Sequence, residues 1–353
     1  MLLKQSRCLI AGIAIALVPV AIPVATHAEP YFEGKTIRLI LGSQPGGRRD
    51  AVTRTTAKFL SKHLPGNPNV IVQNIPGGKE IPSQLKIMNG RKDGSILGVV
   101  NATVLDVPYL GTPGANFDPN KYAYIGSAGT GVFRQTLLTA TRAKFFTLED
   151  LKSREVALGA HRVGHRVYMV CRLIGEVLGL KIRWVLGYSS PSRYLAVDRG
   201  EIDGGCNDAS SAYRQRPDWF DKKLVIANVA LTAPEDMPPF NHPVFAHTPS
   251  LMQFAKTDLH RNIIRKLNTQ GTVGYAFAFP PGTPENIRKI GEKALRNMGK
   301  DPKFIKAWEI GVGINPFPGI HTAAEVREAV KFYTDWKPDI LNAYKRLGYE
   351  PPN

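Results

Sequence analysis

The chain has 353 residues, of which 43 % are hydrophobic and 21 % charged, and its formal net charge is +17. This is the composition of a globular protein, which excludes intrinsic disorder, and the scattered Gly and Pro residues exclude collagen-like and low-complexity chains. The length allows one large domain or two of ordinary size. The basic charge is compatible with nucleic acid, a membrane surface, an anionic small molecule or no specific partner. Because the sequence has no run of five basic residues, the pattern argues against nucleic acid and a membrane surface.

The first 28 residues have the three parts of a secretory signal peptide. Lys4 and Arg7 precede an apolar stretch over residues 9–24, and small residues allow cleavage after Ala28. An uncleaved membrane anchor is the alternative, but the stretch is short for a spanning helix and contains two prolines. We therefore expect an exported protein.

Two cysteines, Cys171 and Cys206, remain after this cleavage. Thiols pair readily in an oxidising compartment, but only if their Cα atoms lie within about 7 Å of each other. The spacing in the sequence does not give that distance, so a disulfide and two free thiols both stay open.

Strands and helices alternate in the first hundred residues. The pattern predicts strands at 36–41, 69–73 and 95–100, and helices at 51–64 and 82–89. We expect Asp50 to cap the first of these helices. This alternation is typical of a parallel sheet with crossover helices.

A second α/β unit begins near residue 125. The sequence predicts strands at 155–158, 181–186, 201–206 and 224–229, helices ending at 178 and spanning 192–199, and an irregular Pro-rich segment at 234–249. The C-terminal hundred residues are expected to be helical, at 284–298, 301–310 and 322–346. Two α/β units followed by helices predict two lobes with a cleft between them.

Three glycine-bearing loops follow predicted strands: Ser43–Gly47, Pro76–Lys79 and Gly159–Gly164. In open α/β sheets, ligands bind beyond the carboxyl ends of the strands. Glycines let a ligand approach the main chain, and N–H groups at helix N-termini favour an anion such as a carboxylate. Arg48, Arg49 and Lys79 add positive charge. The alternative is that these glycines only form tight turns.

Enzyme motifs are largely absent, since the sequence has no phosphate-binding P-loop, no nucleophile elbow and no zinc-protease helix. His161 and His165 are four residues apart and precede Cys171, which would suit a metal, but no carboxylate or second cysteine stands at ligand spacing. We therefore predict no enzymatic activity, no cofactor and no metal. An exported metal-dependent hydrolase that uses both histidines and Asp203 is the alternative.

A series of motifs spans most of the mature chain. They are Pro45-Gly46-Gly47 with Asp50, Asn74-Ile75-Pro76-Gly77-Gly78, Lys92-Asp93-Gly94, Gly159 to His165, Gly187-Tyr188, Gly200-Glu201-Ile202-Asp203, Pro280-Pro281-Gly282-Thr283-Pro284 and Asp301-Pro302-Lys303-Phe304. In this order they resemble the TctC/Bug family, the periplasmic solute receptors of tripartite tricarboxylate transporters.

The resemblance implies a two-lobed type II periplasmic binding protein (a Venus flytrap) in which each lobe is a mixed sheet flanked by helices. It implies a first lobe at 29–125, a second lobe at 126–245 and a segment at 246–353 that returns to the first lobe. The expected protein is a monomeric periplasmic receptor that binds a di- or tricarboxylate, or a related organic anion, and delivers it to membrane permease subunits. A periplasmic sensor that docks onto a membrane kinase is the alternative.

The expected ligand-binding residues come from both lobes. They are Ser43, Gln44, Pro45, Gly46, Gly47, Arg48, Asp50, Gly77, Gly78 and Lys79 from the first lobe, and Ala160, Gly164, His165, Tyr188 and Asp203 from the second. The loops depart from the family pattern at Arg48, Arg49, Lys79 and Glu80, and at Ala160 and His165, where the family has hydroxyl residues. Cations and a histidine can replace lost hydroxyls with charge-assisted hydrogen bonds, so the identity of the ligand stays open.

Overall fold

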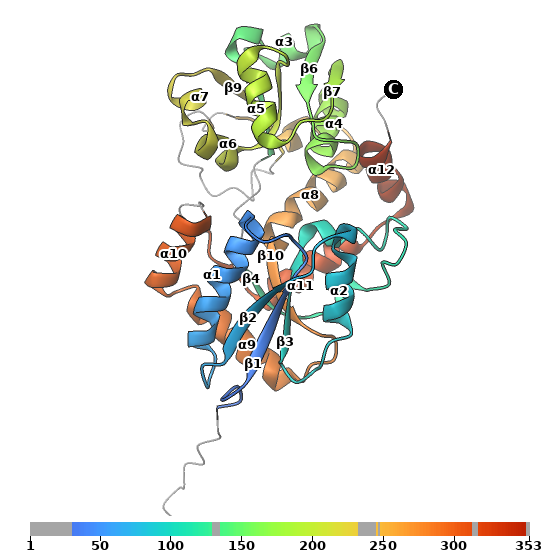
Figure 1. Ribbon diagram of the computed structural model, residues 1–353. Helices are drawn as coiled ribbons and strands as arrows, with labels where there is room; N and C mark the ends of the chain where they lie inside the picture. Colours follow the sequence, from blue (N-terminus) through green and yellow to red (C-terminus); the bar gives the residue numbers. More distant parts are fainter. Residues whose placement is uncertain (1–29, 129–134, 232–244, 246–247, 313–316, 351–353) are drawn as a thin grey trace, which may run out of the picture.

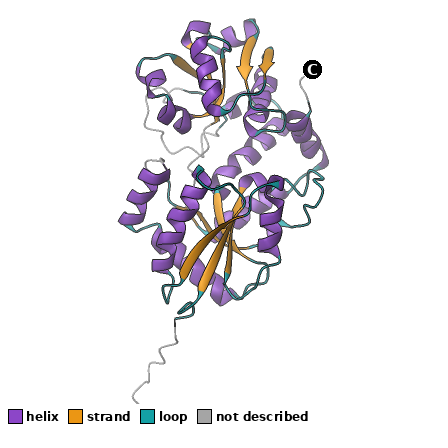
Figure 2. Cartoon of the chain, in the orientation of Figure 1, coloured by secondary structure: helices purple, strands orange, loops and turns teal. Residues whose placement is uncertain are grey.

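Two mixed β-sheets, each covered by helices on both faces, divide the protein into two lobes (Figure 1; Figure 2). The computed structural model describes residues 30–128, 135–231, 245, 248–312 and 317–350. The predicted signal peptide and most of the Pro-rich segment at 234–249 lie outside the described residues. Within the described ranges, no helix is both long enough and apolar enough to cross a membrane. The predicted α/β two-lobed fold class is confirmed.

The first lobe contains a six-stranded sheet with the order β11-β4-β10-β3-β1-β2. Its strands are β1 Thr36–Leu41, β2 Asn69–Asn74, β3 Ile96–Asn101, β4 Ala123–Ala128, β10 Tyr275–Phe279 and β11 Ile320–His321. β1 runs parallel to β2 and β3, whereas β10 pairs antiparallel with β3 and β4. The sheet is therefore completed by strands that lie far downstream of its first four.

Helices pack on both faces of this sheet. They are α1 Arg48–His63, α2 Ile81–Met88, α9 Glu285–Met298, α10 Pro302–Val312 and α11 Ala323–Thr334. The alternation along β1 decides which face each side chain covers. Leu39 and Leu41 join the core formed with α1, α9 and α10, while Ile40 points to the opposite core, formed with α2 and α11. Both faces of β1 are thus buried, as its apolar sequence requires.

The second lobe contains a five-stranded sheet with the order β7-β6-β8-β5-β9. Its strands are β5 Gln135–Ala140, β6 Val156–Gly159, β7 Ile182–Val185, β8 Gly204–Asp208 and β9 Val225–Ala230. The helices are α3 Leu148–Ser153, α4 Arg166–Leu178, α5 Ser190–Arg199, α6 Ala209–Gln215, α7 Pro217–Asp221, α8 Asp258–Val273 and α12 Pro338–Tyr349. Residues of α4, α8 and α12 share one apolar core, and residues of α5, α6 and α7 share another.

Short 3-10 turns connect several elements, at Gly78–Glu80, Ala102–Val104, Pro119–Lys121, Thr141–Ala143 and Leu251–Phe254.

Two helices join the lobes. α8 packs against both α11 and α12, and the buried Lys266 on α8 donates from Nζ to the carbonyl oxygens of Phe332 at 2.6 Å, Tyr333 at 3.2 Å and Asp335 at 2.8 Å. This ammonium satisfies carbonyls at the C-terminal end of α11, where the helix dipole favours a cation. α12 lies on α4 (Figure 1), where Arg346 forms a bidentate ion pair with Glu176.

Cys171 on α4 and Cys206 on β8 form a disulfide, with Cα atoms 5.6 Å apart. Both residues are fully buried. The question that the sequence left open is answered in favour of pairing, and the bond fixes α4 to the centre of the second sheet.

Most predicted elements are confirmed within two or three residues at each end, but three expectations are wrong. The helix predicted at 322–346 is two helices, because Pro338 lacks the N–H that would continue α11. The C-terminal hundred residues contain β10, a central strand of the first sheet. Asp50 does not cap α1, which begins at Arg48 with Gly47 as its N-cap. The lobe boundaries at 29–125, 126–245 and 246–353 stay a prediction, although β4 carries the first sheet through Ala128.

Candidate functional site

The predicted binding loops follow the carboxyl ends of four strands. Ser43–Gly47 follows β1, Pro76–Lys79 follows β2, residues 160–165 follow β6, and Gly187-Tyr188 follows β7. In Figure 2, β6 and β7 of the upper lobe point toward the lower lobe. The loops of both lobes are therefore at the sheet edges where ligands bind in α/β folds.

Asp50 holds the first loop in place. Its Oδ2 accepts hydrogen bonds from the Gly46 amide at 2.9 Å and from Arg54 Nε at 2.8 Å, and its Oδ1 accepts one from Asn74 Nδ2 at 2.9 Å. The same Asn74 nitrogen donates to the Ser43 carbonyl at 2.9 Å. Burial alone would raise the pKa of Asp50, but the hydrogen bonds from Arg54, Gly46 and Asn74 outweigh it and lower the pKa to about 2. Asp50 is thus an ionised clamp between the first two loops, and its predicted contact with a ligand stays a prediction.

The second loop has a strained backbone. Gly77, Gly78, Lys79 and Glu80 all have positive φ, of 98°, 50°, 53° and 67°. Two of them are not glycine, and such residues adopt this region rarely. The turn directs the Glu80 side chain back over the end of β1, where a Cβ added at Gly42 would lie 2.7 Å from Glu80 Oε2.

Glu80 places a carboxylate among the first-lobe loops. It forms an ion pair with the Arg49 guanidinium, and its Oε2 accepts a hydrogen bond from Asn101 Nδ2 at 2.5 Å. The Glu80 side chain is only 13 % exposed. Arg49, which the sequence predicts to add positive charge for a ligand, is therefore neutralised by the chain's own acid.

Most of the remaining first-lobe candidates stay accessible. Gln44, Pro45, Gly46, Gly47, Gly77, Gly78 and Lys79 are exposed, and Arg48 is half-buried. Within the part of the chain that the structure describes, neither Arg48 nor Lys79 forms an ion pair, and Ser43 Oγ is buried without a hydrogen-bond partner. These loops keep polar groups and two cations that a ligand can use.

The two histidines of the second lobe lie side by side. The rings of His161 and His165 stack with centroids 5.0 Å apart, and His165 Nδ1 caps α4 by accepting from the Val167 amide at 3.2 Å. Burial, followed by the neighbouring His161 and the positive charges of Arg193, Arg162 and Arg166, lowers the pKa of His165 to about 4. His165 is therefore neutral at pH 7, and the surrounding potential is positive.

A metal centre around these histidines would need further ligands close by. Among the described residues, no three His, Cys, Asp or Glu residues lie close enough together to hold a metal ion. Cys171, the third residue of the sequence pattern, is bound in the disulfide.

Four other second-lobe candidates make contacts within the protein. The amide of the fully buried Ala160 donates to the Val185 carbonyl at 3.0 Å, and the Gly164 amide donates to Gly348 on α12 at 2.7 Å. Tyr188 Oη donates to Glu201 at 3.2 Å. Asp203 precedes β8 and accepts from the Ala157 amide at 2.8 Å, so it lies toward the opposite end of the sheet from the loops. Ala160, Gly164, His165 and Tyr188 therefore lie at the expected edge of the sheet, and Asp203 does not.

The sequence analysis did not single out Arg193 and Asn207, a buried cation and its hydrogen-bond partner in the second lobe. Arg193 is 2 % exposed, and its Nε and Nη2 donate to Asn207 Oδ1 at 3.1 and 2.7 Å. Gly159 and Gly205, on the neighbouring strands β6 and β8, are the sequence signal that could have identified this pair. Glycines inside a sheet mark a place where another group approaches the backbone closely.

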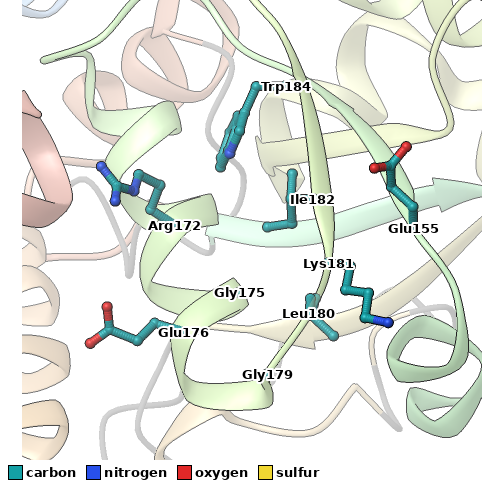
Figure 3. A pocket seen from close by; sticks show the side chains of 9 residues that line it. All are labelled: Glu155, Arg172, Gly175, Glu176, Gly179, Leu180, Lys181, Ile182 and Trp184. Carbon is teal, nitrogen blue, oxygen red and sulfur yellow. The ribbon is translucent and has the colours of Figure 1, made fainter. Parts of the chain in front are cut away.

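Two cavities lie away from these loops. One, of about 610 Å³, is bordered by the starts of β6 and β7 and the end of α4. Figure 3 shows Arg172 and Glu176 on its wall; Arg172 donates to the carbonyls of Arg346 and Glu350, and Glu176 pairs with Arg346, so both serve to attach α12. The other, of about 630 Å³, is lined by residues such as Tyr31 and Pro284 in the first lobe.

Comparison with known proteins finds a similar protein by sequence and several similar folds. No family model matches the chain. A UPF0065 protein of Bordetella pertussis is 25 % identical over 288 residues, covering 80 % of this chain and 81 % of that protein. The chain is thus similar in sequence to a UPF0065 protein and similar in fold to TctC and Bug solute-binding proteins.

Solved structures of such proteins share its fold. A TctC solute-binding protein from Polaromonas superposes with a TM-score of 0.66 at 17 % identity, over 88 % of this chain and 99 % of that one. The periplasmic binding protein BugD gives a TM-score of 0.55 at 16 % identity, over 90 % and 99 %. MatC from Rhodopseudomonas palustris, whose structure contains malate, gives 0.53 at 17 % identity, over 88 % and 100 %. The TctC/Bug-like chain therefore has the fold of periplasmic solute-binding proteins.

Proposed function

We propose that this TctC/Bug-like protein is a periplasmic receptor that binds a small organic carboxylate between its lobes and delivers it to a membrane transporter. The observation that carries the proposal is the set of accessible loops at the carboxyl ends of β1 and β2, which combine exposed glycine amides with the cations Arg48 and Lys79. Backbone N–H groups beside cations are typical binding groups for carboxylates. The protein acts by binding rather than by catalysis.

The fold supports this proposal, because a protein of the same fold, MatC, has been solved with malate. Two-lobed receptors work by closing around the ligand, which then stabilises the closed population. In this chain α8 and α12 connect the lobes and provide the elements about which closure can occur.

The intramolecular carboxylate of Glu80 bears on the choice of ligand. It pairs with the guanidinium of Arg49 and accepts a hydrogen bond from the side-chain amide of Asn101. The negative charge of Glu80 would therefore repel a ligand carboxylate at the same place. We therefore expect the first lobe to hold its ligand through the Gln44–Gly47 and Pro76–Lys79 loops, and we expect Glu80→Gln to raise the affinity for a dicarboxylate.

Thermal unfolding in the presence of carboxylic acids tests the proposal. A panel of malate, citrate, adipate and benzoate is added to purified, ligand-free protein. A ligand present at 100 times its Kd stabilises the folded state by about 2.7 kcal/mol, which raises the midpoint by several degrees. Absence of a shift with every acid, in protein shown to be folded and ligand-free, would contradict the proposed function.

Delivery to a transporter is tested separately. Uptake of labelled ligand is measured in cells that lack this protein and in cells that express Lys79→Glu, which reverses one exposed cation of the loop. We expect both to lose uptake, with Lys331→Glu as the control because Lys331 is an exposed residue of α11.

A further inference from the structure

Arg193 carries a buried positive charge that no acid among the described residues balances. Its side chain is 2 % exposed, and its hydrogen bonds go to neutral groups, Asn207 Oδ1 and, at 3.5 Å, Ser190 Oγ. Within the described ranges, no carboxylate lies within ion-pair distance of it. A buried charge is costly unless it is paired. The protein therefore retains a cation at a cost in stability.

The second sheet is shaped to hold this guanidinium. A Cβ added at Gly205 would lie 3.0 Å from Arg193 Cδ, and one added at Gly159 would lie 3.1 Å from Arg193 Cγ. The side chain thus lies flat across β6 and β8, in space that only glycines leave. Asn207 is fixed in turn, because its Nδ2 donates to the Gly205 carbonyl at 2.9 Å. The guanidinium is held in one orientation before any ligand arrives.

One side of the guanidinium has no hydrogen-bond partner among the described residues. Nε and Nη2 both donate to Asn207, whereas Nη1 has no hydrogen bond among the described residues. The group lies beside Asn207, the penultimate residue of β8, at the edge of the sheet where the 160–165 loop begins. The positive charge of Arg193 reaches His165 in that loop. Asp208, the nearest acid along β8, instead accepts from the Ser211 amide as the cap of α6.

We propose that Arg193 is the second lobe's anion receptor, whose free Nη1 edge binds a carboxylate group of the ligand. The identity of the ligand in this assignment rests on the proposed function, whereas the anion site itself does not. A guanidinium edge recognises a planar carboxylate with charge-assisted hydrogen bonds. The ligand is then oriented with one acidic group toward Arg193 in the second lobe, while the Gln44–Gly47 and Pro76–Lys79 loops of the first lobe hold its other end.

The test uses two variants that abolish the unpaired positive charge by different routes, one by pairing it and one by deleting it. Asn207→Asp places a carboxylate on the guanidinium with almost no change in shape, and Arg193→Met removes the charge. Arg183→Gln is the control, because Arg183 on β7 is 56 % exposed. The readout is the Arg193 side-chain Nε–H signal in protein labelled with ¹⁵N-arginine, during titration with acetate, malate and adipate.

We expect a saturable shift of the Arg193 signal in the wild type and in Arg183→Gln, assigned by its loss in Arg193→Met. Asn207→Asp should weaken binding about 10- to 100-fold, yet unfold at the same temperature or a higher one, since the buried charge gains a partner. A purely structural role for Arg193 would not separate affinity from stability in this way.

The outcomes distinguish this inference from the proposed function. A response of Arg193 to acetate without binding of malate or adipate supports the anion site and contradicts a dicarboxylate ligand. An unresponsive Arg193 signal with all three acids, or binding by Asn207→Asp within threefold of the wild type, overturns the assignment of Arg193, whatever the protein binds.

Discussion

Replacement of Asp50 by Asn should destabilise the protein in a pH-dependent way. The change keeps the shape of the side chain and removes the charge that Arg54, Asn74 and the Gly46 amide stabilise. The pKa of Asp50 falls from 3.8 to about 2 in the folded protein, and the side chain is only 6 % exposed. The ionised form is therefore favoured by folding, and linkage gives about 2.4 kcal/mol at pH 7.

The sign follows from the direction of the shift. A lowered folded-state pKa means that the stabilisation is complete above pH 3.8 and is lost as the pH falls through about 2. At pH 3 about 1.3 kcal/mol of it should remain. Urea unfolding of the wild type and of Asp50→Asn at pH 7 and pH 3 measures the difference, with Asp258→Asn as the control because Asp258 is 89 % exposed. A difference that stays constant between the two pH values would refute the reasoning.

Two further predictions concern the attachment of the helices. The disulfide closes a loop with a sequence separation of 35, so Cys171→Ala/Cys206→Ala should lower the free energy of unfolding by about 4 kcal/mol in urea without reductant; a double variant as stable as the wild type would show that α4 and β8 need no covalent link. Lys266→Met removes the ammonium from three carbonyls at the end of α11 and should cost about 3 kcal/mol, also measured in urea. Lys331→Met on the exposed face of α11 is the control, and an equal effect of both variants would contradict a capping role for Lys266.

The sequence predicts the fold well because its strongest signals are local. β1, β2 and β3 are apolar, β-branched runs bounded by Gly and Pro, and they lie within a residue or two of their predicted ranges. β10 was missed because Tyr275–Phe279 is short and follows a helix directly, so that only pairing with β3 and β4 identifies it as a strand. Such pairing connects residues more than a hundred positions apart, and no local pattern carries it.

The site was less predictable than the fold for a similar reason. The positions of the first-lobe loops follow from strand ends, but the fate of each side chain depends on distant partners. In the sequence Arg49 is a cation without a visible partner, but the structure pairs it with Glu80. Gly164 looks like an ordinary loop glycine, but its amide donates a hydrogen bond to Gly348 of α12. Arg193 by itself has no recognisable signal in the sequence, because two glycines on other elements make room for its side chain and an asparagine binds its guanidinium.

The position of α12 has a consequence for how the chain is made. The second lobe's core, formed by β5, β6, β8 and α4, is completed by Ile340, Tyr344 and Leu347 of α12, which begins at residue 338, whereas β9 ends at residue 230. A chain that leaves the ribosome or passes a membrane N-terminus first must leave this core open until roughly a hundred more residues have emerged. Because α12 is synthesised late, the core of the second lobe can be completed only near the end of synthesis.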